Sequence, residues 1–264
     1  MLIVGERINA TRKKIGEAVQ NQDAEHIKAE AIKQVEAGAH MIDVNGGVPG
    51  KETEYLLWLV DLVQEVVEVP LCLDSADANA LAAALPQCNE PALINSITFE
   101  KERLEAMTPL VKEHDAKVIA LCLSDEGPPQ DFDGRIEIAA RLVDRLTGDG
   151  IPLENIYVDP CVFPISTSSD VGTFVLDAIS WIHEQYPGVH TICGASNVSF
   201  GLPMRKILNA TFLAMLIARG LDSAIIDPCN AMTRACVLAA EALAGHDDFC
   251  TNYIGAFRAG QLEV

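Results

Sequence analysis

Short apolar runs alternate along the chain with longer segments in which apolar residues recur every three or four positions. This alternation is typical of parallel βα units, whose crossover helices bury the strands on both faces. The strands that it predicts cover residues 2–8, 41–45, 71–75, 92–96, 118–123, 156–160, 191–196 and 224–228.

Helices are predicted between these strands, at residues 13–38, 52–67, 101–114, 134–147, 170–186, 202–220 and 231–245, with an alanine-rich helix after residue 75. The first of them is long, and Asn21-Gln-Asp23 is expected to break it into two pieces. Strands in strict alternation with helices, eight of each, favour a closed (β/α)8 barrel, the TIM barrel, over an open doubly wound sheet. No linker or low-complexity tract divides residues 1–264, so we expect one α/β domain.

The length of 264 residues suits one such barrel, and 49% hydrophobic with 22% charged residues is typical of a soluble enzyme. The formal net charge of −19 disfavours nucleic acid and anionic membranes as partners. It would attract a basic protein partner, although it could equally serve only to keep the chain soluble. No apolar stretch is long enough to span a membrane, and the chain begins without a signal-peptide pattern, so we expect a cytoplasmic protein.

The cysteines form no Cys-x-x-Cys pair, which is the usual spacing in zinc and iron–sulfur sites. Disulfides are not expected either, because the sequence shows no export signal. We therefore interpret the thiols as small apolar residues of the core. They are Cys72, Cys88, Cys122, Cys161, Cys193, Cys229, Cys236 and Cys250.

Polar residues gather where the predicted strands end. These positions are Glu6, Arg7, Asn9, Asp43, Asn45, Asp74, Ser75, Asn95, Ser96, Asp159, Ser196, Asn197 and Asp227. The carboxyl ends of the strands form the active-site face of such barrels, so most of these groups are expected in one mouth. Asp and Asn also cap helices, and capping is favoured for Asp227, just before Pro228 and the last helix. Capping is less favoured for Asp74, Asn95 and Asp159, which lie several residues ahead of their helices.

Carboxylates together with a carboxamide suit a flat heterocycle with several N–H donors, such as a 2-amino-4-oxo pyrimidine ring. The chain has no glycine-rich loop of the P-loop or Rossmann type, which disfavours nucleotides. Its six histidines fall on helices or just before strands, so acid–base catalysis by histidine is disfavoured. The residues alone thus indicate a polar barrel mouth and leave its reaction open.

Five short motifs, each on a predicted strand or at its end, resemble those of the pterin-binding methyltransferase family. They are Gly5-Glu-Arg-Ile-Asn9, Leu71-Cys-Leu-Asp-Ser75, Ile94-Asn-Ser96, Tyr157-Val-Asp-Pro160 and Gly194-Ala-Ser-Asn-Val-Ser199. The chain is similar to methyltetrahydrofolate:corrinoid/iron–sulfur protein methyltransferases and to methylcorrinoid-protein:tetrahydrofolate methyltransferases, and more distantly to the folate module of cobalamin-dependent methionine synthase. The resemblance runs from the first strand to the last helix and implies a dihydropteroate synthase-like, pterin-binding barrel over residues 1–264.

The resemblance also assigns roles to residues of the mouth. It implies that Asp74, Asn95 and Asp159 hold the pterin ring, with Gly194 and Ser196 lining the same pocket. It further implies that three residues lie on the pocket wall or hold ordered water; these are Glu6, Asn9 and Asp43.

Asn197 matches the family residue whose amide approaches N5 of the folate, so it is the implied catalytic residue. Ile225 is expected to pack on the pterin face, and Arg205 lies where the glutamate tail or the corrinoid partner could reach it. Before Arg205 the chain reads Phe200-Gly-Leu-Pro-Met204, where some acetogen-type relatives carry polar residues.

The activity that the resemblance implies is methyl transfer between a folate and a corrinoid. The folate substrate is tetrahydrofolate or 5-methyltetrahydrofolate, and the corrinoid (cobalamin) is carried by a partner protein. No metal bound by this chain is implied. The Ser199-Phe-Gly-Leu-Pro203 segment favours transfer from methylcorrinoid protein to tetrahydrofolate in a demethylation system. The alternatives are the opposite direction, toward a corrinoid/iron–sulfur protein in acetyl-CoA synthesis, and a non-catalytic folate-binding subunit.

Dihydropteroate synthase shares the barrel and the pterin pocket but would be expected to carry a lysine near the end of strand seven and Arg-x-His at strand eight. The chain has Ala195-Ser-Asn197 and Ile226-Asp-Pro228 there, which argues against that activity. Barrels of this family are often dimers, so the resemblance implies a homodimer, with the apolar segment 210–218 as a candidate interface. That segment could equally pack on the barrel.

Overall fold

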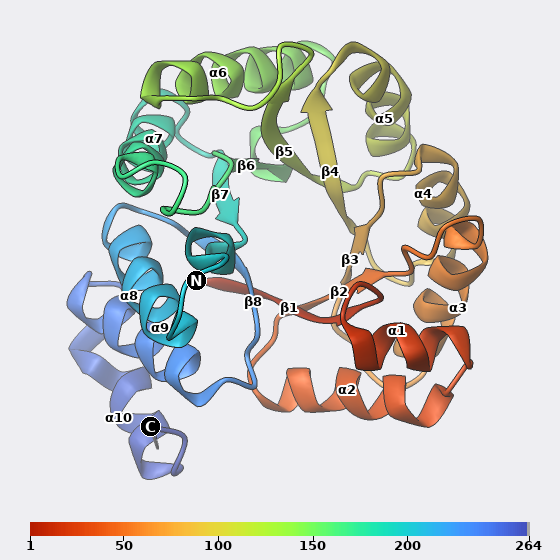
Figure 1. Cartoon of the computed structure of the whole chain (residues 1–264), viewed down its shortest axis with the longest axis horizontal. Helices are drawn as coiled ribbons and strands as arrows, with labels where there is room; N and C mark the ends of the chain where they lie inside the picture. Colours follow the sequence, from red (N-terminus) through yellow and green to blue (C-terminus); the bar gives the residue numbers. More distant parts are fainter. Residues whose placement is uncertain (263–264) are drawn as a thin grey trace.

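Eight parallel strands close into a barrel in the computed structural model, which describes residues 1–262. The strands are β1 (Leu2–Asn9), β2 (Met41–Asn45), β3 (Leu71–Asp74), β4 (Leu93–Phe99), β5 (Lys117–Ser124), β6 (Ile156–Asp159), β7 (His190–Cys193) and β8 (Ser223–Ile226). Each strand pairs with the next one in the chain, and β8 pairs with β1 to close the barrel (Figure 1). The predicted (β/α)8 architecture is confirmed.

Helices surround the barrel and cover the outer faces of its strands (Figure 1). They are α1 (Lys13–Gln20), α2 (Ala24–Glu36), α3 (Glu52–Gln64), α4 (Ala78–Ala84), α5 (Lys101–Glu113), α6 (Phe132–Gly148), α7 (Val171–Gln185), α8 (Arg205–Ala218), α9 (Ala231–Leu243) and α10 (Thr251–Arg258). Short 3-10 helices are η1 (Leu85–Gln87), η2 (Leu153–Asn155), η3 (Ala195–Ser199) and η4 (Asp248–Cys250). None of the helices within residues 1–262 combines the length and the apolar character that crossing a membrane requires.

The break predicted in the first helical segment is confirmed. α1 ends at Gln20, and α2 begins after Asp23, whose carboxylate accepts a hydrogen bond from the backbone N–H of His26 at 3.2 Å. This is an N-cap, which satisfies one of the backbone donors left free at the start of a helix.

Several boundaries differ from the prediction by a few residues; β4, for example, extends to Phe99 instead of residue 96. β7 ends at Cys193 rather than at residue 196, because the chain turns into η3 from Ala195 onward. The C-terminal helix α10 was not predicted, and left-handed backbone conformations at Phe249 and Cys250 separate it from α9. Residues other than glycine, asparagine and aspartate rarely adopt this conformation, so the sequence carries no signal for the turn.

A layer of apolar side chains fills the barrel interior below the carboxyl ends of the strands. Its members are Val4, Met41, Cys72, Leu93, Ile119, Tyr157 and Ile192, and we call them the interior layer. Two larger apolar clusters lie between the strands and the helices outside. The interior layer therefore forms the floor of the space at the carboxyl ends of the strands.

The cysteine thiols are all free, as predicted for a chain without disulfides. Cys72, Cys122 and Cys193 are buried, which confirms their interpretation as core residues. The interpretation is wrong for Cys250, which is exposed because it lies in the surface turn that precedes α10.

Candidate active site

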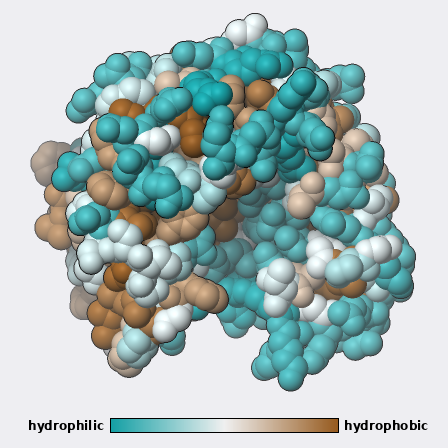
Figure 2. Space-filling model, turned by 45° about the horizontal axis from the view of Figure 1, so that its top comes forward, coloured by the Kyte–Doolittle hydropathy of each residue, from teal (hydrophilic) through white to brown (hydrophobic). Residues whose placement is uncertain are grey.

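A cavity of about 660 Å³ opens at the carboxyl ends of the strands. The central hollow of the molecule is visible in the space-filling view of Figure 2. The cavity is lined by every site residue predicted from the sequence except Arg205. These residues are Glu6, Asn9, Asp43, Asp74, Asn95, Asp159, Gly194, Ser196, Asn197 and Ile225. We call this cavity the ring pocket.

The position of these residues follows from the period of two along a strand, which points every second side chain to the same face. The residues two positions after members of the interior layer all line the ring pocket. They are Glu6, Asp43, Asp74, Asn95, Leu121, Asp159 and Gly194. Each strand thus gives one residue to the apolar floor and, two positions later, one residue to the largely polar wall.

Two carboxyl groups lie on neighbouring strands of this wall. Asp43 is buried, with 2% of its surface exposed, and its Oδ1 atom finds no hydrogen-bond partner within residues 1–262. Burial, and then repulsion by the charge of Asp74, raises the pKa of Asp43 well above its ordinary value. Burial likewise raises the pKa of Asp74, although Oδ2 of Asp74 accepts a hydrogen bond from Nδ2 of Asn45 at 2.9 Å. Asn45 closes β2 and shares the strand-end signal of the predicted residues, but the prediction gave it no role in the site.

Asp159, at the end of β6, is a third buried carboxyl group. Its Oδ1 atom accepts a hydrogen bond from the backbone N–H of Cys161 at 2.8 Å. Burial outweighs this hydrogen bond and raises the pKa of Asp159 to about 7. The group can therefore donate as well as accept hydrogen bonds near neutral pH.

Glu6 forms the boundary of the ring pocket on the side of β1. Nη2 of Arg12 lies 2.9 Å from Oε1 of Glu6 in an ion pair. Burial nevertheless raises the pKa of Glu6, and the charge of Arg12 opposes this shift. Arg12 precedes α1 and was not predicted as a site residue, because no strand-end pattern marks its position.

Asn197 lies on η3, just beyond β7, and its side chain is exposed at the mouth. Its carboxamide forms no hydrogen bond with any residue between 1 and 262, whereas its backbone N–H donates to the carbonyl of Gly194 at 3.2 Å. The amide is therefore held on a turn of fixed geometry and remains free to contact a ligand. Apolar side chains, including those of Ile225 and Phe200, complete the lining.

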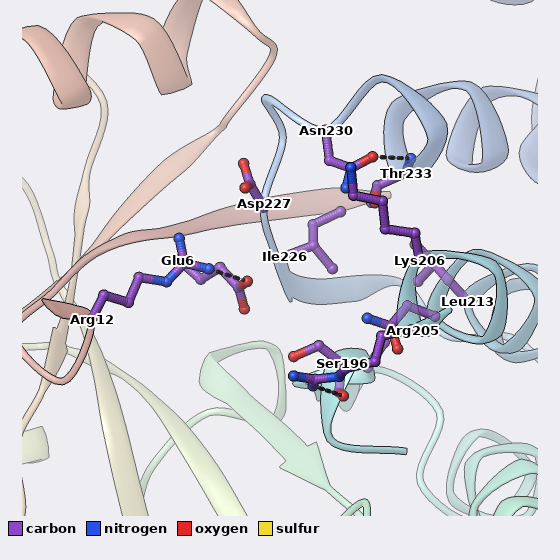
Figure 3. Close-up of a pocket in the computed structure, with 12 residues that line it drawn as sticks. Glu6, Arg12, Ser196, Arg205, Lys206, Leu213, Ile226, Asp227, Asn230 and Thr233 are labelled. Atoms are coloured by element: carbon purple, nitrogen blue, oxygen red, sulfur yellow. Dashed lines mark hydrogen bonds and ion pairs between the residues drawn. The ribbon is translucent and has the colours of Figure 1, made fainter. Parts of the chain in front are cut away.

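Arg205 lies in a second, smaller cavity beside the ring pocket (Figure 3). Its guanidinium donates hydrogen bonds to Oγ of Ser199 at 3.0 Å and to the backbone carbonyl of Ser196 at 2.8 Å. The two cavities share Glu6, Arg12 and Ser196 in their linings. Arg205 is thus adjacent to the ring pocket without lining it.

The predicted capping role of Asp227 is wrong. Asn230 caps α9, because its Oδ1 atom accepts from the backbone N–H groups of Met232 and Thr233. Asp227 instead accepts from Nη1 of Arg7 at 2.9 Å. A loop of three residues after Asp227 leaves it too far from the helix to serve as its cap.

No histidine lines either cavity, and within residues 1–262 no group of three or more His, Cys, Asp or Glu side chains could hold a metal ion. The ring pocket instead offers buried carboxyl groups and carboxamides. The acceptor on Asp43 that lacks a partner suits a ligand rich in N–H donors, because a buried acceptor without a partner is costly. A flat, polar heterocycle fits this donor set.

Comparison with known proteins identifies relatives over nearly the whole chain. The family model described as pterin binding enzyme matches residues 5–227. The methylcorrinoid:tetrahydrofolate methyltransferase of Eubacterium limosum is 36% identical over 265 residues, covering 99% of this chain and 98% of that protein. The methionine synthase of Mycobacterium tuberculosis is 32% identical over 240 residues, which are 86% of this chain but only 20% of that protein.

Solved structures of dihydropteroate synthases share the fold at low sequence identity. The enzyme from Xanthomonas albilineans in complex with 7,8-dihydropteroate superposes with a TM-score of 0.74 at 15% identity, covering 92% of this chain and 93% of that chain. A dihydropteroate synthase from Yersinia pestis gives a TM-score of 0.71 at 14% identity, over 92% and 94% of the two chains. The predicted dihydropteroate synthase-like barrel is confirmed.

Replacing Asp159 by asparagine is expected to change how stability depends on pH. In the folded protein the carboxyl group keeps its proton up to about pH 7, whereas in the unfolded chain it loses the proton near 3.8. Between these values the folded state binds more protons, so this group makes the free energy of unfolding fall as pH rises. Asp159→Asn removes the contribution, and urea unfolding between pH 4 and pH 7 should show a flatter pH dependence. Asp61→Asn, an exposed aspartate on α3, is the matched control, and equal slopes in Asp159→Asn and the unchanged protein would contradict the assignment.

Proposed function

This chain belongs to the pterin-binding enzyme family, and we propose that it is a methyltransferase acting between N5 of tetrahydrofolate and the cobalt of a corrinoid protein. The observation that carries the proposal is the ring pocket, where Asp74, Asn95 and Asp159 share one cavity with the free carboxamide of Asn197. Similarity to the Eubacterium limosum enzyme over almost its full length supports the same reaction.

The pterin ring presents an amino group, a ring N–H and a carbonyl oxygen on adjacent positions. Asp74 and Asp159 would accept the N–H donors, and the amide of Asn95 can both donate and accept. Gly194 and Ser196 would line the ring, as Glu6, Asn9 and Asp43 would line the wall or hold water. Ile225 would pack on the ring face. Holding the ring in a fixed position brings N5 to the reacting methyl group without a further loss of freedom in the transition state.

Asn197 would act on N5 itself. When the methyl group leaves N5, the nitrogen must not become an amide-like anion, so a hydrogen bond or a proton at N5 stabilises the transition state. The bond between N5 and the methyl carbon breaks as the bond between cobalt and carbon forms. In the opposite direction the N5 lone pair forms a bond to the methyl carbon as the cobalt–carbon bond breaks and leaves cobalt(I). N5 then releases its proton, which gives the neutral product amine. Asn197 carries a free carboxamide at the mouth, which suits this role.

We propose that the physiological direction is from methylcorrinoid protein to tetrahydrofolate, in a demethylation system. The Phe200-Gly-Leu-Pro203 segment and the similarity to a methylcorrinoid:tetrahydrofolate methyltransferase support this direction. Transfer from methyltetrahydrofolate to the corrinoid uses the same groups in reverse and is the second candidate. A subunit that only binds folate would have no need of an unpaired amide beside the ring pocket.

An apolar rim beside the ring pocket supports docking of the corrinoid protein. Phe200, Met204 and Ile207 expose 67%, 72% and 50% of their surface between η3 and the first turn of α8. Phe200 also lines the ring pocket, so the rim is continuous with the site. We propose that the partner covers this rim while its cobalt reaches N5, and that both proteins lie in the cytoplasm, where free thiols such as those of this chain persist.

We further propose a homodimer, through a surface other than segment 210–218. Most apolar side chains of that segment, including Phe212, Leu213 and Leu216, are buried against the barrel. Exposed apolar side chains gather instead around α10. They are Leu243, Phe249, Tyr253, Ile254 and Phe257. Figure 2 shows apolar surface on the side of the molecule where Figure 1 places α8, α9 and α10.

Replacing Asn197 by alanine is expected to slow methyl transfer by about 10²- to 10³-fold, the usual cost of removing one such donor. The measurement is the loss of cobalt(I) absorbance after anaerobic mixing of the protein with cob(I)alamin and methyltetrahydrofolate. Asn89→Ala, at an exposed position away from the mouth, is the control and should react like the unchanged chain. If calorimetry shows folate binding but no reaction follows, a folate-binding subunit is favoured. If the protein does not bind folate, the methyltransferase proposal is wrong.

Replacing Met204 by serine is expected to slow the reaction with the corrinoid protein about tenfold, because a buried methionine side chain stabilises an interface by about 1.5–3 kcal/mol. The reaction with free cob(I)alamin should slow much less, since free cobalamin has no protein surface to dock. Ile32→Ser removes an exposed apolar side chain on α2 and serves as the control. Equal rates for Met204→Ser and Ile32→Ser with the corrinoid protein would contradict docking on the rim.

Replacing Phe257 by glutamate is expected to convert a dimer into a monomer, because the substitution places a charge in the proposed interface. Analytical ultracentrifugation should give twice the chain mass of 28.4 kDa for the unchanged protein and one chain mass for the variant. Ile32→Glu, at the exposed position on α2, should remain dimeric. A monomeric unchanged protein would exclude this interface.

A further inference from the structure

A buried arginine lies behind one wall of the ring pocket. Arg135, on α6, is the largest of the fully buried side chains, and it forms no salt bridge within residues 1–262. Its Nε atom also finds no hydrogen-bond partner in that part of the chain. A buried charge without a counterion destabilises the folded state, so the contacts of this side chain need an explanation beyond the volume that it fills.

The guanidinium of Arg135 contacts the segment that follows β6. Nη2 donates a hydrogen bond to the backbone carbonyl of Cys161 at 3.3 Å, and Nη1 donates to the backbone carbonyl of Asp131, just before α6, at 2.8 Å. Cζ lies 5.8 Å from the ring centroid of Phe163 and 6.0 Å from that of Phe174, distances at which an aromatic ring attracts a cation. Two carbonyls and two rings therefore take the place of a carboxylate.

The segment that Arg135 contacts forms part of the wall of the ring pocket, because residues 161–164 all line that cavity. Cys161 has a φ of 65°, in the left-handed region that a cysteine rarely adopts. A conformation of this kind persists only where the surrounding structure holds it. The hydrogen bond from Arg135 to the carbonyl of Cys161 is one such restraint.

Both backbone groups of Cys161 are engaged. Its carbonyl accepts from Arg135, and its N–H donates to Oδ1 of Asp159 at 2.8 Å. Within residues 1–262 the carboxyl group of Asp159 forms no other hydrogen bond, so its orientation depends on the direction of this N–H. A chain of hydrogen bonds thus runs from α6 through one peptide unit to a carboxyl group of the ring pocket.

Packing alone does not account for an arginine at this position. An apolar side chain of similar length, such as methionine, would fill the space without burying a charge, and such exchanges are often neutral or stabilising. Methionine would lack an N–H donor for the carbonyl of Cys161. The feature that distinguishes Arg135 from an apolar residue is therefore its hydrogen bond to the wall.

We propose that Arg135 is a positioning residue of the ring pocket, which holds the turn at Cys161 so that Asp159 directs its carboxyl group at the pterin ring. Arg135 does not line the ring pocket and acts through Cys161. This inference rests on the proposed folate-binding function and adds to it a residue that the ring does not touch.

The direct test replaces Arg135 by methionine and follows the carboxyl carbon of Asp159 by NMR as pH is varied, without folate. In the unchanged protein burial raises the pKa of Asp159 to about 7, and the hydrogen bond from Cys161 opposes this shift. Loss of that hydrogen bond removes stabilisation of the charged form, so the titration midpoint should move to higher pH in Arg135→Met. The absence of the signal from Asp159→Asn assigns it.

The ionisable groups around Asp159 are the same in both proteins. The thiols that face it are those of Cys122 on β5, Cys193 on β7 and Cys161. Burial raises the pKa of each of these thiols, so all three stay neutral while Asp159 titrates. The other carboxyl groups that line the ring pocket are those of Glu6, Asp43 and Asp74.

Folate binding gives the functional measurement. Calorimetry at neutral pH should show that Arg135→Met binds tetrahydrofolate about fivefold more weakly, the effect expected for one misplaced hydrogen bond. Arg145→Met removes an exposed arginine from the same helix, makes the same change in net charge, and should match the unchanged protein in both measurements. Arg135→Lys keeps a cation but not the planar fork that reaches two carbonyls, so it should change both measurements less and in the same direction. It takes the place of Arg135→Met if that variant does not fold.

Each outcome separates this inference from the proposed function. A titration midpoint of Asp159 that is unchanged in the Arg135 variants would overturn the inference even if their stability falls, because a purely structural role lowers stability alone. A shifted midpoint with unchanged folate affinity would also overturn it, since the restraint would not serve the ring. Absence of folate binding by the unchanged protein would overturn the proposed function, whereas the titration would still report whether Arg135 acts on Asp159.

Discussion

The alternation of side chains along a parallel strand is the constraint on which the whole site depends. Inside a closed barrel, a strand that gives one residue to the apolar interior layer gives its next inward residue to the mouth. Cys72 and Tyr157 lie in the layer, and Asp74 and Asp159 follow them two positions later in the ring pocket. A shift of one residue in either strand would turn its carboxylate into the apolar shell of helices, so packing of the core also fixes the chemistry of the mouth.

The same arrangement carries a free-energy penalty in the protein without a ligand, because it buries carboxyl groups at the mouth. Burial raises the pKa of Asp43, Asp74 and Asp159, because water is partly excluded from their surroundings. Carboxyl groups of this kind can accept or donate hydrogen bonds, depending on whether each one keeps its proton. A ring with N–H donors and a carbonyl acceptor would supply the missing partners, so the penalty in the free protein favours binding of a ligand with this pattern.

The sequence was sufficient to predict the barrel and most of the ring pocket, because strand ends are marked by a local change from apolar to polar residues. It was not sufficient to predict Arg12, which lines the site from a position just before α1 that no strand-end pattern marks. The role of Asp227 was also missed, since a cap and an ion pair with a residue on β1 look alike until the strands close. α10 follows a turn built from Phe249 and Cys250, residue types that carry no turn signal.

Asn197 differs from the buried carboxyl groups in being exposed, and its exposure follows from the chemistry proposed for it. A methyl group that arrives on the cobalt of another protein must approach N5 from outside the barrel, so the group that acts on N5 must lie at the opening. An amide at the opening is surrounded by water in the free protein, and water weakens the stabilisation that it can give to developing charge. The exposed apolar side chains of Phe200 and Met204 lie beside it. A partner that covers them would exclude water from Asn197 in the same step that brings the cobalt to the folate.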